Sequence, residues 1–207
     1  MAGKVLRRLV GNQRGVTLVE FAFVAPILIV MIMGLSDLLY TFYATSILTG
    51  AVQKAGRDSA IQGGGEAADD IDATVVSALA RMMKTPSQSC DENPTAGTWC
   101  ATRRTYTAFA QVRPEPFVDN NGNAVRDPKE CFTDINGNGT WNPDAGRVGQ
   151  GGSDDVTLYT FRLTFARIFP LPWRAGGGTA TTISVSTLLK NQPYAAQDIV
   201  VPAEVCT

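Results

Sequence analysis

The apolar positions of the chain are concentrated near its beginning. Val16 to Leu35 is a run of 20 residues in which Glu20 carries the only charge. A helix rises about 1.5 Å per residue, so the run is about 30 Å long, the thickness of the hydrocarbon core of a bilayer. We predict a membrane-spanning helix here. A charge at the centre of such a helix costs about 3 kcal/mol, so something should compensate Glu20.

The helical pattern continues beyond the apolar run. Leu39, Tyr43, Ile47 and Ala51 recur every four residues and form one apolar stripe. The stretch "QGGGEAADD" follows, and three consecutive glycines end a helix because ordering them costs too much backbone entropy. We therefore predict one long helix over residues 16–62, half in lipid and half emerging from it.

A second, shorter helix is predicted over about 67–84. Its apolar residues Ile71, Val75, Leu79 and Met82 share one face. Acidic residues gather near its beginning and basic residues near its end, which suits the helix dipole.

Residues after Pro86 have the composition of strands. The stretches "RTYTAFAQV" (104–112), "VTLYTFRLTFARIF" (156–169) and "TATTISVSTLL" (179–189) are rich in Thr, Val and aromatics and partly alternate. The middle stretch shifts phase near Tyr159, which indicates a bulge there. The predicted fold class is α+β, with a long N-terminal helix packed on a small antiparallel sheet in a domain of residues 63–207.

The distribution of charge orients the chain. Lys4, Arg7, Arg8 and Arg14 precede the apolar run without any acid, so the positive-inside rule keeps residues 1–15 in the cytoplasm. The rest of the chain holds 14 Lys and Arg against 19 Asp and Glu, a net charge of −5. We expect a single-pass inner-membrane protein with a periplasmic C-terminal domain. Such an acidic domain is not a nucleic-acid binder.

All four cysteines follow the apolar run. They are Cys90, Cys100, Cys131 and Cys206. The chain has no CxxC pair and no histidine, so disulfides are favoured over metal ligation on the oxidising side of a membrane. Of the three pairings, we favour Cys90 with Cys100 and Cys131 with Cys206.

The residues around Gly15 form a recognisable motif. The dipeptide "RG" followed by "VTLVEF" resembles a type IV prepilin cleavage site, in which Gly15 ends a basic leader and Val16 begins the mature chain. With "VTLVEFAFVAPILIVMIMGL" and, near the C-terminus, "VSTLLKNQPY", the chain is similar to the TadE-like pseudopilins of the Tad (tight adherence) pilus system. It departs from that pattern at Phe21, often Tyr, and at Gln192, usually Glu.

The resemblance gives Glu20 a partner. Cleavage after Gly15 would place an α-amino group on Val16, one helical turn from Glu20, and in pilin-like assemblies this glutamate is thought to pair with the amine of a neighbouring subunit. At 4 Å and an effective dielectric near 20 the attraction is about 4 kcal/mol, comparable to the burial cost. The implied partners are a prepilin peptidase, other pilins or pseudopilins, and the inner membrane. The alternative reading is an uncleaved signal anchor. A secretory signal peptide fits less well, because the apolar run is too long and no A-x-A site follows it.

An Asp/Asn-rich stretch at residues 117–146 is an internal duplication. In "FVDNNGNAVRDPKECFTDINGNGTWNPDA", a shift of 15 residues superimposes Phe117 on Phe132 and Asp119 on Asp134. Oxygen-bearing side chains at loop positions 1, 3, 5 and 9 with an acid at 12 form an EF-hand-like calcium pattern.

Each copy fits that pattern imperfectly. The first copy offers Asp119, Asn121, Asn123, the carbonyl of Val125, Asp127 and Glu130, but has Ala124 in place of glycine. The second offers Asp134, Asn136, Asn138, the carbonyl of Thr140 and Asn142, with Gly139 in place but Ala145 where the acid belongs. The two copies either cooperate or share Glu130. We predict weak calcium binding; the alternative is a pair of Asn-Gly turns.

These features favour a structural role over catalysis. The leading hypothesis is a TadE-like pseudopilin, cleaved by a prepilin peptidase, that acts in the assembly or priming of a Tad-type adhesive pilus. A permanently anchored periplasmic or surface calcium-binding module is the alternative. We expect no enzyme, because histidine is absent and the Asp/Asn cluster contains no nucleophile arrangement, although a Ser/Lys or paired-carboxylate site stays open.

Overall fold

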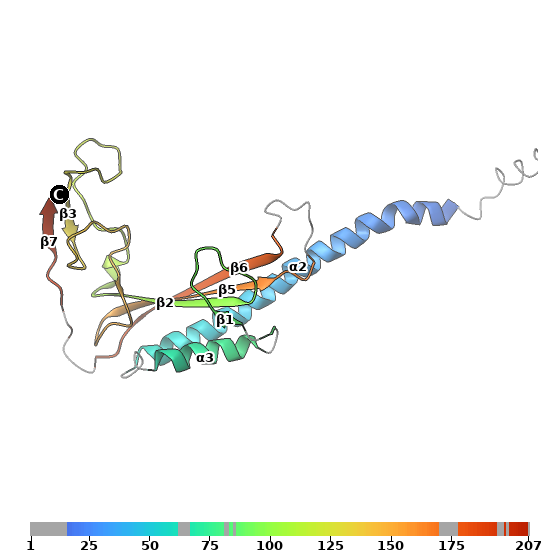
Figure 1. Cartoon of the computed structure of the whole chain (residues 1–207), viewed down its shortest axis with the longest axis horizontal. Coiled ribbons are helices and arrows are strands. Elements are labelled where there is room, and N and C mark those ends of the chain that lie inside the picture. Colours follow the sequence, from blue (N-terminus) through green and yellow to red (C-terminus); the bar gives the residue numbers. More distant parts are fainter. Residues whose placement is uncertain are drawn as a thin grey trace, which may run out of the picture.

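A long helix and a small sheet domain make up the structure (Figure 1). The computed structural model describes residues 16–61, 67–80, 83–84, 86–169, 178–193, 197 and 199–206. Its helices are α2 (Val16–Ser59) and α3 (Ala68–Leu79), with a short 3-10 helix at Phe109–Gln111. Its strands are β1 (Ser87–Gln88), β2 (Thr98–Tyr106), β3 (Cys131–Asp134), β4 (Arg147–Val148), β5 (Val156–Ala166), β6 (Ala180–Lys190) and β7 (Ala203–Cys206).

The predicted α+β class is confirmed. β2, β5 and β6 form an antiparallel sheet with β5 in the middle, and the short strands β1 and β4 pair with the outer edge of β2. β1 runs parallel to β2, so the sheet is mixed at that edge. A separate antiparallel pair, β3 with β7, lies at the end of the molecule farthest from the start of α2 (Figure 1).

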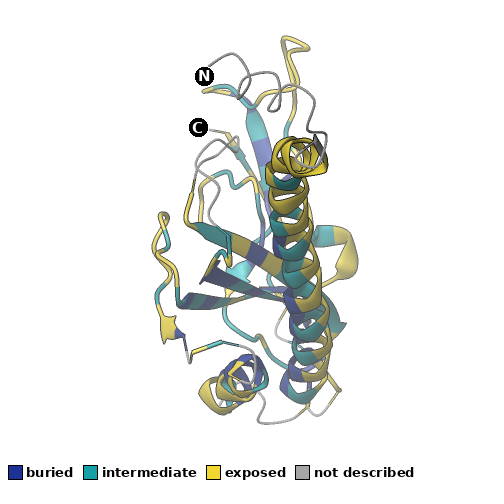
Figure 2. Ribbon diagram, turned by 90° about the vertical axis from the view of Figure 1, so that its right-hand side faces the viewer, coloured by how far each residue is buried: buried dark blue, intermediate teal, exposed yellow. Residues whose placement is uncertain are grey.

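The core lies between the helices and one face of the sheet (Figure 2). Its apolar side chains come from the second half of α2, from α3, from β5 and from β6. They include Ala44, Leu48, Val52, Ile71, Val75, Leu79, Tyr159, Phe161, Leu163 and Ile183. The stripe predicted on α3 packs in this core, although Met82 lies outside the described residues and α3 is shorter than predicted. The stripe predicted on α2 is wrong: Leu39 and Tyr43 are exposed, because the sheet and α3 contact the neighbouring side of the helix.

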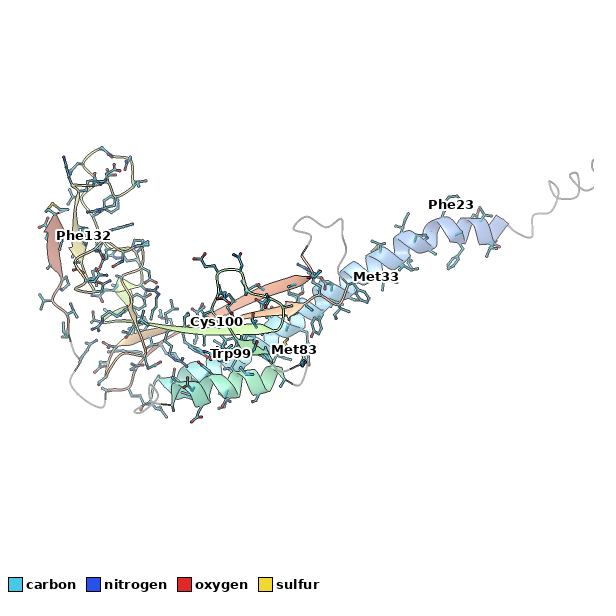
Figure 3. All side chains as sticks on the ribbon, in the orientation of Figure 1. Phe23, Met33, Met83, Trp99, Cys100 and Phe132 are labelled. Carbon is cyan, nitrogen blue, oxygen red and sulfur yellow. A yellow bond between two sulfur atoms is a disulfide. The ribbon has the colours of Figure 1, made fainter. Side chains whose placement is uncertain are left out.

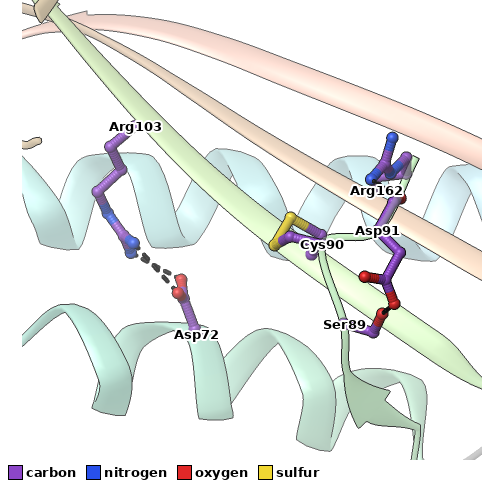
Figure 4. Close-up of a disulfide and its surroundings, with 7 residues drawn as sticks. Asp72, Ser89, Cys90, Asp91, Arg103 and Arg162 are labelled. Atoms are coloured by element: carbon purple, nitrogen blue, oxygen red, sulfur yellow. Dashed lines mark hydrogen bonds and ion pairs between the residues drawn. A yellow bond between two sulfur atoms is a disulfide. The ribbon is translucent and has the colours of Figure 1, made fainter. Parts of the chain in front are cut away.

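An ion pair holds α3 to the sheet. Arg103 of β2 donates to both oxygens of the buried Asp72 carboxylate, at 2.6 and 3.1 Å (Figure 4). The Tyr159 hydroxyl donates to the same carboxylate at 2.6 Å. Burial, and then this hydrogen bond, raise the pKa of Tyr159 above its ordinary value. Asp72 therefore faces the sheet, where the sequence pattern suggested only a favourable charge near the helix start.

Two local predictions are wrong. The first long strand begins at Thr98, not at Arg104, because β2 pairs with β5 along its whole length, whereas Phe109 lies in the 3-10 helix. The pairing of β5 with both neighbours runs through Tyr159 without a bulge. The apparent phase shift arises because Val156 and Leu158 are apolar residues on the face of β5 away from the helices, whereas Tyr159 begins the run that faces the core.

Both favoured disulfides are present. Cys90 is bonded to Cys100 and so ties the segment after β1 to β2 (Figures 3 and 4). Cys131 is bonded to Cys206 and joins the facing ends of β3 and β7. The second bridge closes a loop of 75 residues, long enough to restrict the unfolded chain strongly.

Candidate functional site

The first turns of α2, as far as Ile32, are apolar, and no described residue outside the helix packs on them. The most apolar window of α2 has a mean hydropathy of 2.5, and none of that window is buried within the described structure. Figure 3 shows Phe23 projecting from the helix away from the rest of the protein. This helix is long and apolar enough to cross a membrane.

The residues of the expected processing site lie at the start of this helix. α2 begins at Val16, while Gly15 and the leader lie outside the described residues. Phe21 and Glu20 are exposed on the first turns, and no described residue makes a hydrogen bond or ion pair with the side chain of Glu20. The glutamate therefore has no partner within the described part of its own chain.

The first Asp/Asn loop is built around Asp119. Its carboxylate accepts hydrogen bonds from three backbone N–H groups, those of Gly122, Asn123 and Ala124, at 2.7 to 3.2 Å. The Ala124 N–H makes the largest contribution to a pKa of Asp119 below its ordinary value. The carboxylate is thus ionised at neutral pH, and its stabilising effect is lost only when the pH falls below about 3.9.

The remaining polar side chains of the first loop converge on one point. The side-chain amides of Asn121 and Asn123 both donate to Oδ2 of Asp127, at 2.7 and 2.9 Å. Positions 3, 5 and 9 of the proposed ligand set are therefore within hydrogen-bond reach of one another.

The second loop repeats the arrangement atom for atom. Asp134 accepts from the N–H groups of Gly137, Asn138 and Gly139. The amides of Asn136 and Asn138 donate to Oδ1 of Asn142, at 2.9 and 2.7 Å. The duplication seen in the sequence is thus a duplication in space.

The two copies face each other across a local two-fold axis. Phe117 and Phe132 form an antiparallel bridge. Val118 N–H donates to the carbonyl of Cys131, and Thr133 N–H donates to the carbonyl of Pro116, at 2.8 Å each. A shift of 15 residues exchanges these two hydrogen bonds, so the copies pair as equivalent units.

Each loop is closed by its own buried glutamate. Glu130 accepts from the N–H groups of Asn120 and Asp127, at positions 2 and 9 of the first loop. Glu115 accepts from Ile135 and Asn142, the same positions of the second loop, at 3.0 and 2.8 Å. Glu115 therefore supplies the carboxylate that the second loop lacks at Ala145. The second loop does not need to share Glu130 with the first.

Sequence reasoning missed Glu115 although the signal was present. Glu115 precedes Glu130 by 15 residues, the period of the duplication, but it lies before the first loop and closes the second. The alanine that replaces the expected glycine in the first loop keeps the backbone conformation of that glycine. Ala124 adopts a left-handed backbone with φ of 60°, which matches the φ of 74° at Gly139.

Surrounding charges differ between the two loops. A cavity of about 340 Å³ beside the second loop is lined by Asn136, Asn138 and Asn142 together with Arg104 and Arg147. Nε of Arg104 lies 3.1 Å from a carboxylate oxygen of Asp144. The second loop thus has fewer carboxylates among its own residues than the first, and two arginines from outside the loop line the cavity beside it.

The C-terminal part of the pseudopilin resemblance, "VSTLLKNQPY", contains a buried asparagine. The Asn191 amide donates to the carbonyls of Gln150 and Gly152, at 3.0 and 2.7 Å. The neighbouring Gln192 N–H donates to the carbonyl of Ala60, and Gln150 donates to the carbonyl of Ser59. This segment fastens the end of α2 to the end of the sheet, which is a structural role.

One edge of the main sheet is open in the described structure. Arg167 N–H bonds to Thr179 and Asn191 N–H bonds to Asp155, so the odd-numbered residues of β6 face β5. The backbone groups of the even-numbered residues, such as Ser184 and Ser186, point outward, and no described residue bonds to them. β6 also contains no proline and only one charge, the terminal Lys190, so it lacks the usual protection of an edge strand.

The comparisons with known proteins concern the first part of the chain. A family model described as TadE-like protein matches residues 15–57. Neither the curated proteins nor the solved structures yield a match to the chain. The matched segment covers nearly all of α2 and begins at the glycine of the predicted cleavage motif. Over residues 15–57, this chain is therefore similar to the TadE-like proteins.

Proposed function

We propose that this chain is a membrane-anchored pseudopilin, processed by a prepilin peptidase and acting in the assembly or priming of a Tad-type pilus. The observation that carries the proposal is α2 itself. Its first half is apolar and uncovered, its second half packs on the sheet, and the TadE-like match coincides with it. One continuous helix thus joins a membrane anchor rigidly to an exported domain.

The same features support the proposed topology. The four bases before Val16 favour a cytoplasmic N-terminus, and the two disulfides suit an oxidising periplasm. The Glu20 side chain, without a described partner in its own chain, is available to the α-amino group of a neighbouring subunit. The permanently anchored alternative would keep its leader and would need no such pairing.

Cleavage is tested by substituting the residue before the scissile bond. Gly15→Leu should leave a full-length precursor in the membrane fraction, because a small residue is needed where the bond enters the peptidase. Gly11→Leu, four residues upstream in the same leader, is the matched control and should still be processed. Intact-mass measurement distinguishes the products, and a Gly15→Leu chain that begins at Val16 would refute the assigned site.

Glu20 is tested separately from insertion. Glu20→Leu should insert into the membrane at least as well as the wild type, because removing a charge lowers the insertion cost, yet it should reduce pilus assembly. Val24→Leu, one turn further along the same exposed surface, is the control. Unimpaired pilus biogenesis in the Glu20 variant would argue against the pairing.

The open edge of β6 is the proposed contact for partner subunits. Backbone groups that point outward can accept an added strand, which binds through main-chain hydrogen bonds. Ser184→Pro removes one outward N–H and should keep the fold while reducing assembly; Val185→Pro removes an N–H that faces β5 and should destabilise the sheet. Normal assembly with Ser184→Pro would exclude this edge.

Calcium binding at the distal loops is a second proposed property. Two symmetry-related loops, each with its own buried glutamate, offer an array of oxygen atoms suited to a hard cation. The first loop carries three acids, Asp119, Asp127 and Glu130, whereas the second carries Asp134 and Glu115. We expect weak affinity, with the first loop the stronger.

Thermal unfolding of the full chain in detergent tests calcium. A cation bound only by the folded form at a hundred times Kd stabilises it by about 2.7 kcal/mol, so Tm should rise in millimolar calcium and fall with chelator. Asp119→Ala with Asp134→Ala should abolish the rise, whereas Glu92→Ala, an exposed acid outside the loops, should preserve it. A wild-type Tm that is unchanged by calcium would show that the loops are a pair of turns that do not bind calcium.

A further inference from the structure

The apolar exposed surface of α2 is longer than a hydrocarbon core. Exposed large apolar side chains extend from Leu18 to Tyr43. At about 1.5 Å per residue this stretch is about 38 Å long, compared with about 30 Å for the hydrocarbon core and 40–45 Å for the bilayer with its headgroups. If the helix spans the membrane, residues from about Asp37 to Tyr43 lie at the level of the outer headgroups.

The sheet domain reaches down to this same level. Arg167, directly after β5, donates to a carboxylate oxygen of Asp37 at 2.8 Å, and the Asp37 side chain is only 5% exposed. The rings of Tyr40 and Phe165 meet edge to face with centroids 5.6 Å apart. The end of the β5–β6 hairpin is thus fixed beside the part of α2 that is still apolar on its other sides.

The exposure of the α2 side chains indicates the level that the described part of the hairpin reaches on the helix. Residues 27–32 are exposed all round, whereas Met33 is partly covered and Asp37 is buried. On the opposite side of the helix Leu35 and Leu39 remain exposed. The hairpin end therefore lies alongside the outer part of the apolar stretch, not above it.

The described side chains at the hairpin end suit a membrane interface. Ile168 is 48% exposed, Phe169 is half-buried, and the Arg167 charge is matched by Asp37. An ion pair of this kind is what allows a carboxylate to lie so close to lipid.

We propose that Arg167–Phe169, at the end of the β5–β6 hairpin, rests in the outer headgroup layer as a second membrane contact. The inference depends on the proposed function in one respect, that α2 spans the membrane. Lipid is the occupant because the exposed Ile168 directly follows Arg167, which the ion pair with Asp37 holds at the level where α2 still exposes apolar side chains. The contact would fix the rotation of α2 and its attached sheet relative to the bilayer, with the distal loops directed away from it.

Spin labels at three depths test the proposal. A single cysteine for labelling replaces Phe23 on the anchor (75% exposed), Ile168 at the hairpin end (48% exposed) or Val148 on the distal part of the sheet (89% exposed). The three variants are Phe23→Cys, Ile168→Cys and Val148→Cys. The full-length chain is labelled and reconstituted in phosphatidylethanolamine and phosphatidylglycerol vesicles. Collision with oxygen, which concentrates in lipid, is then compared with collision with a water-soluble nickel complex. Circular dichroism and intact disulfides establish that each variant is folded.

The proposal predicts an intermediate oxygen-to-nickel ratio at Ile168, several-fold above that at Val148 and below that at Phe23. A ratio equal to that at Val148 would place the hairpin end in water and overturn the proposal, as would protection from both reagents, which indicates a protein partner. A Phe23 label that behaves like Val148 would instead overturn the membrane anchor itself. The two failures are therefore distinguishable.

Discussion

The two halves of α2 are both rich in apolar residues but have opposite surroundings. In the first half, side chains such as Phe23 and Ile27 are exposed, and apolar residues occupy every side of the helix. In the second half, Ala44, Leu48 and Val52 are fully buried against the sheet and α3. A helix with apolar residues on one side can bury them against the rest of its own chain. A helix that is apolar on every side needs lipid or another subunit to bury them.

The largest expected difference between the halves is in core packing. Leu48→Ala should lower the free energy of unfolding by about 3 kcal/mol, because it leaves a cavity in a close-packed core. Leu28→Ala, in the exposed half, should change it by less than about 0.5 kcal/mol. Urea unfolding in detergent, followed by tryptophan fluorescence, measures both. Equal losses would mean that the first half is also packed within the domain.

A smaller effect is expected at the junction of the halves. Asp37→Asn breaks the ion pair with Arg167, and because that pair is mostly buried the change should cost about 2 kcal/mol. Asp58→Asn removes the exposed pair with Lys54 and should cost less than about 0.5 kcal/mol. The same unfolding assay compares them, and a negligible cost at Asp37 would show that the junction is not fixed by this contact.

The smallest effects come from two glycines of the second half. Gly50 has no atom within 4 Å of where a Cβ would lie, so Gly50→Ala should stabilise the helix by about 0.5–1 kcal/mol. A Cβ at Gly56 would instead clash with Thr187, so Gly56→Ala should destabilise by about 1 kcal/mol. Thermal unfolding gives the sign of each change. If both variants are stabilised, α2 does not pack on β6 at Gly56.

Sequence patterns predicted the elements whose formation depends on local periodicity. The continuous α2, the buried face of α3 with Ile71 and Val75, and strands β5 and β6 all follow from helical or alternating spacing. Both disulfides were also anticipated, although spacing alone did not distinguish the three pairings. In α3 the residue pattern and the tertiary contacts agree, whereas on α2 the helix was predicted correctly but its buried side was not.

The features that were missed depend on partners far apart in the chain. Glu115 closes a loop that begins 19 residues later, and Asp72 is buried by Arg103, which lies 31 residues further on. The start of β2 at Thr98 is set by its pairing with β5. Tertiary contacts determine these partners and this strand boundary, so no local sequence pattern could indicate them. Only the 15-residue period could have revealed Glu115.

The central claim is that α2 becomes the N-terminal helix of a processed, membrane-anchored subunit. The most direct test is the N-terminal residue of the wild-type chain extracted from the membrane, determined by intact-mass measurement and N-terminal sequencing. The account predicts a chain that begins at Val16, with both disulfides formed. A membrane-extracted chain that retains Gly15 and the basic leader would contradict it and favour a permanently anchored protein.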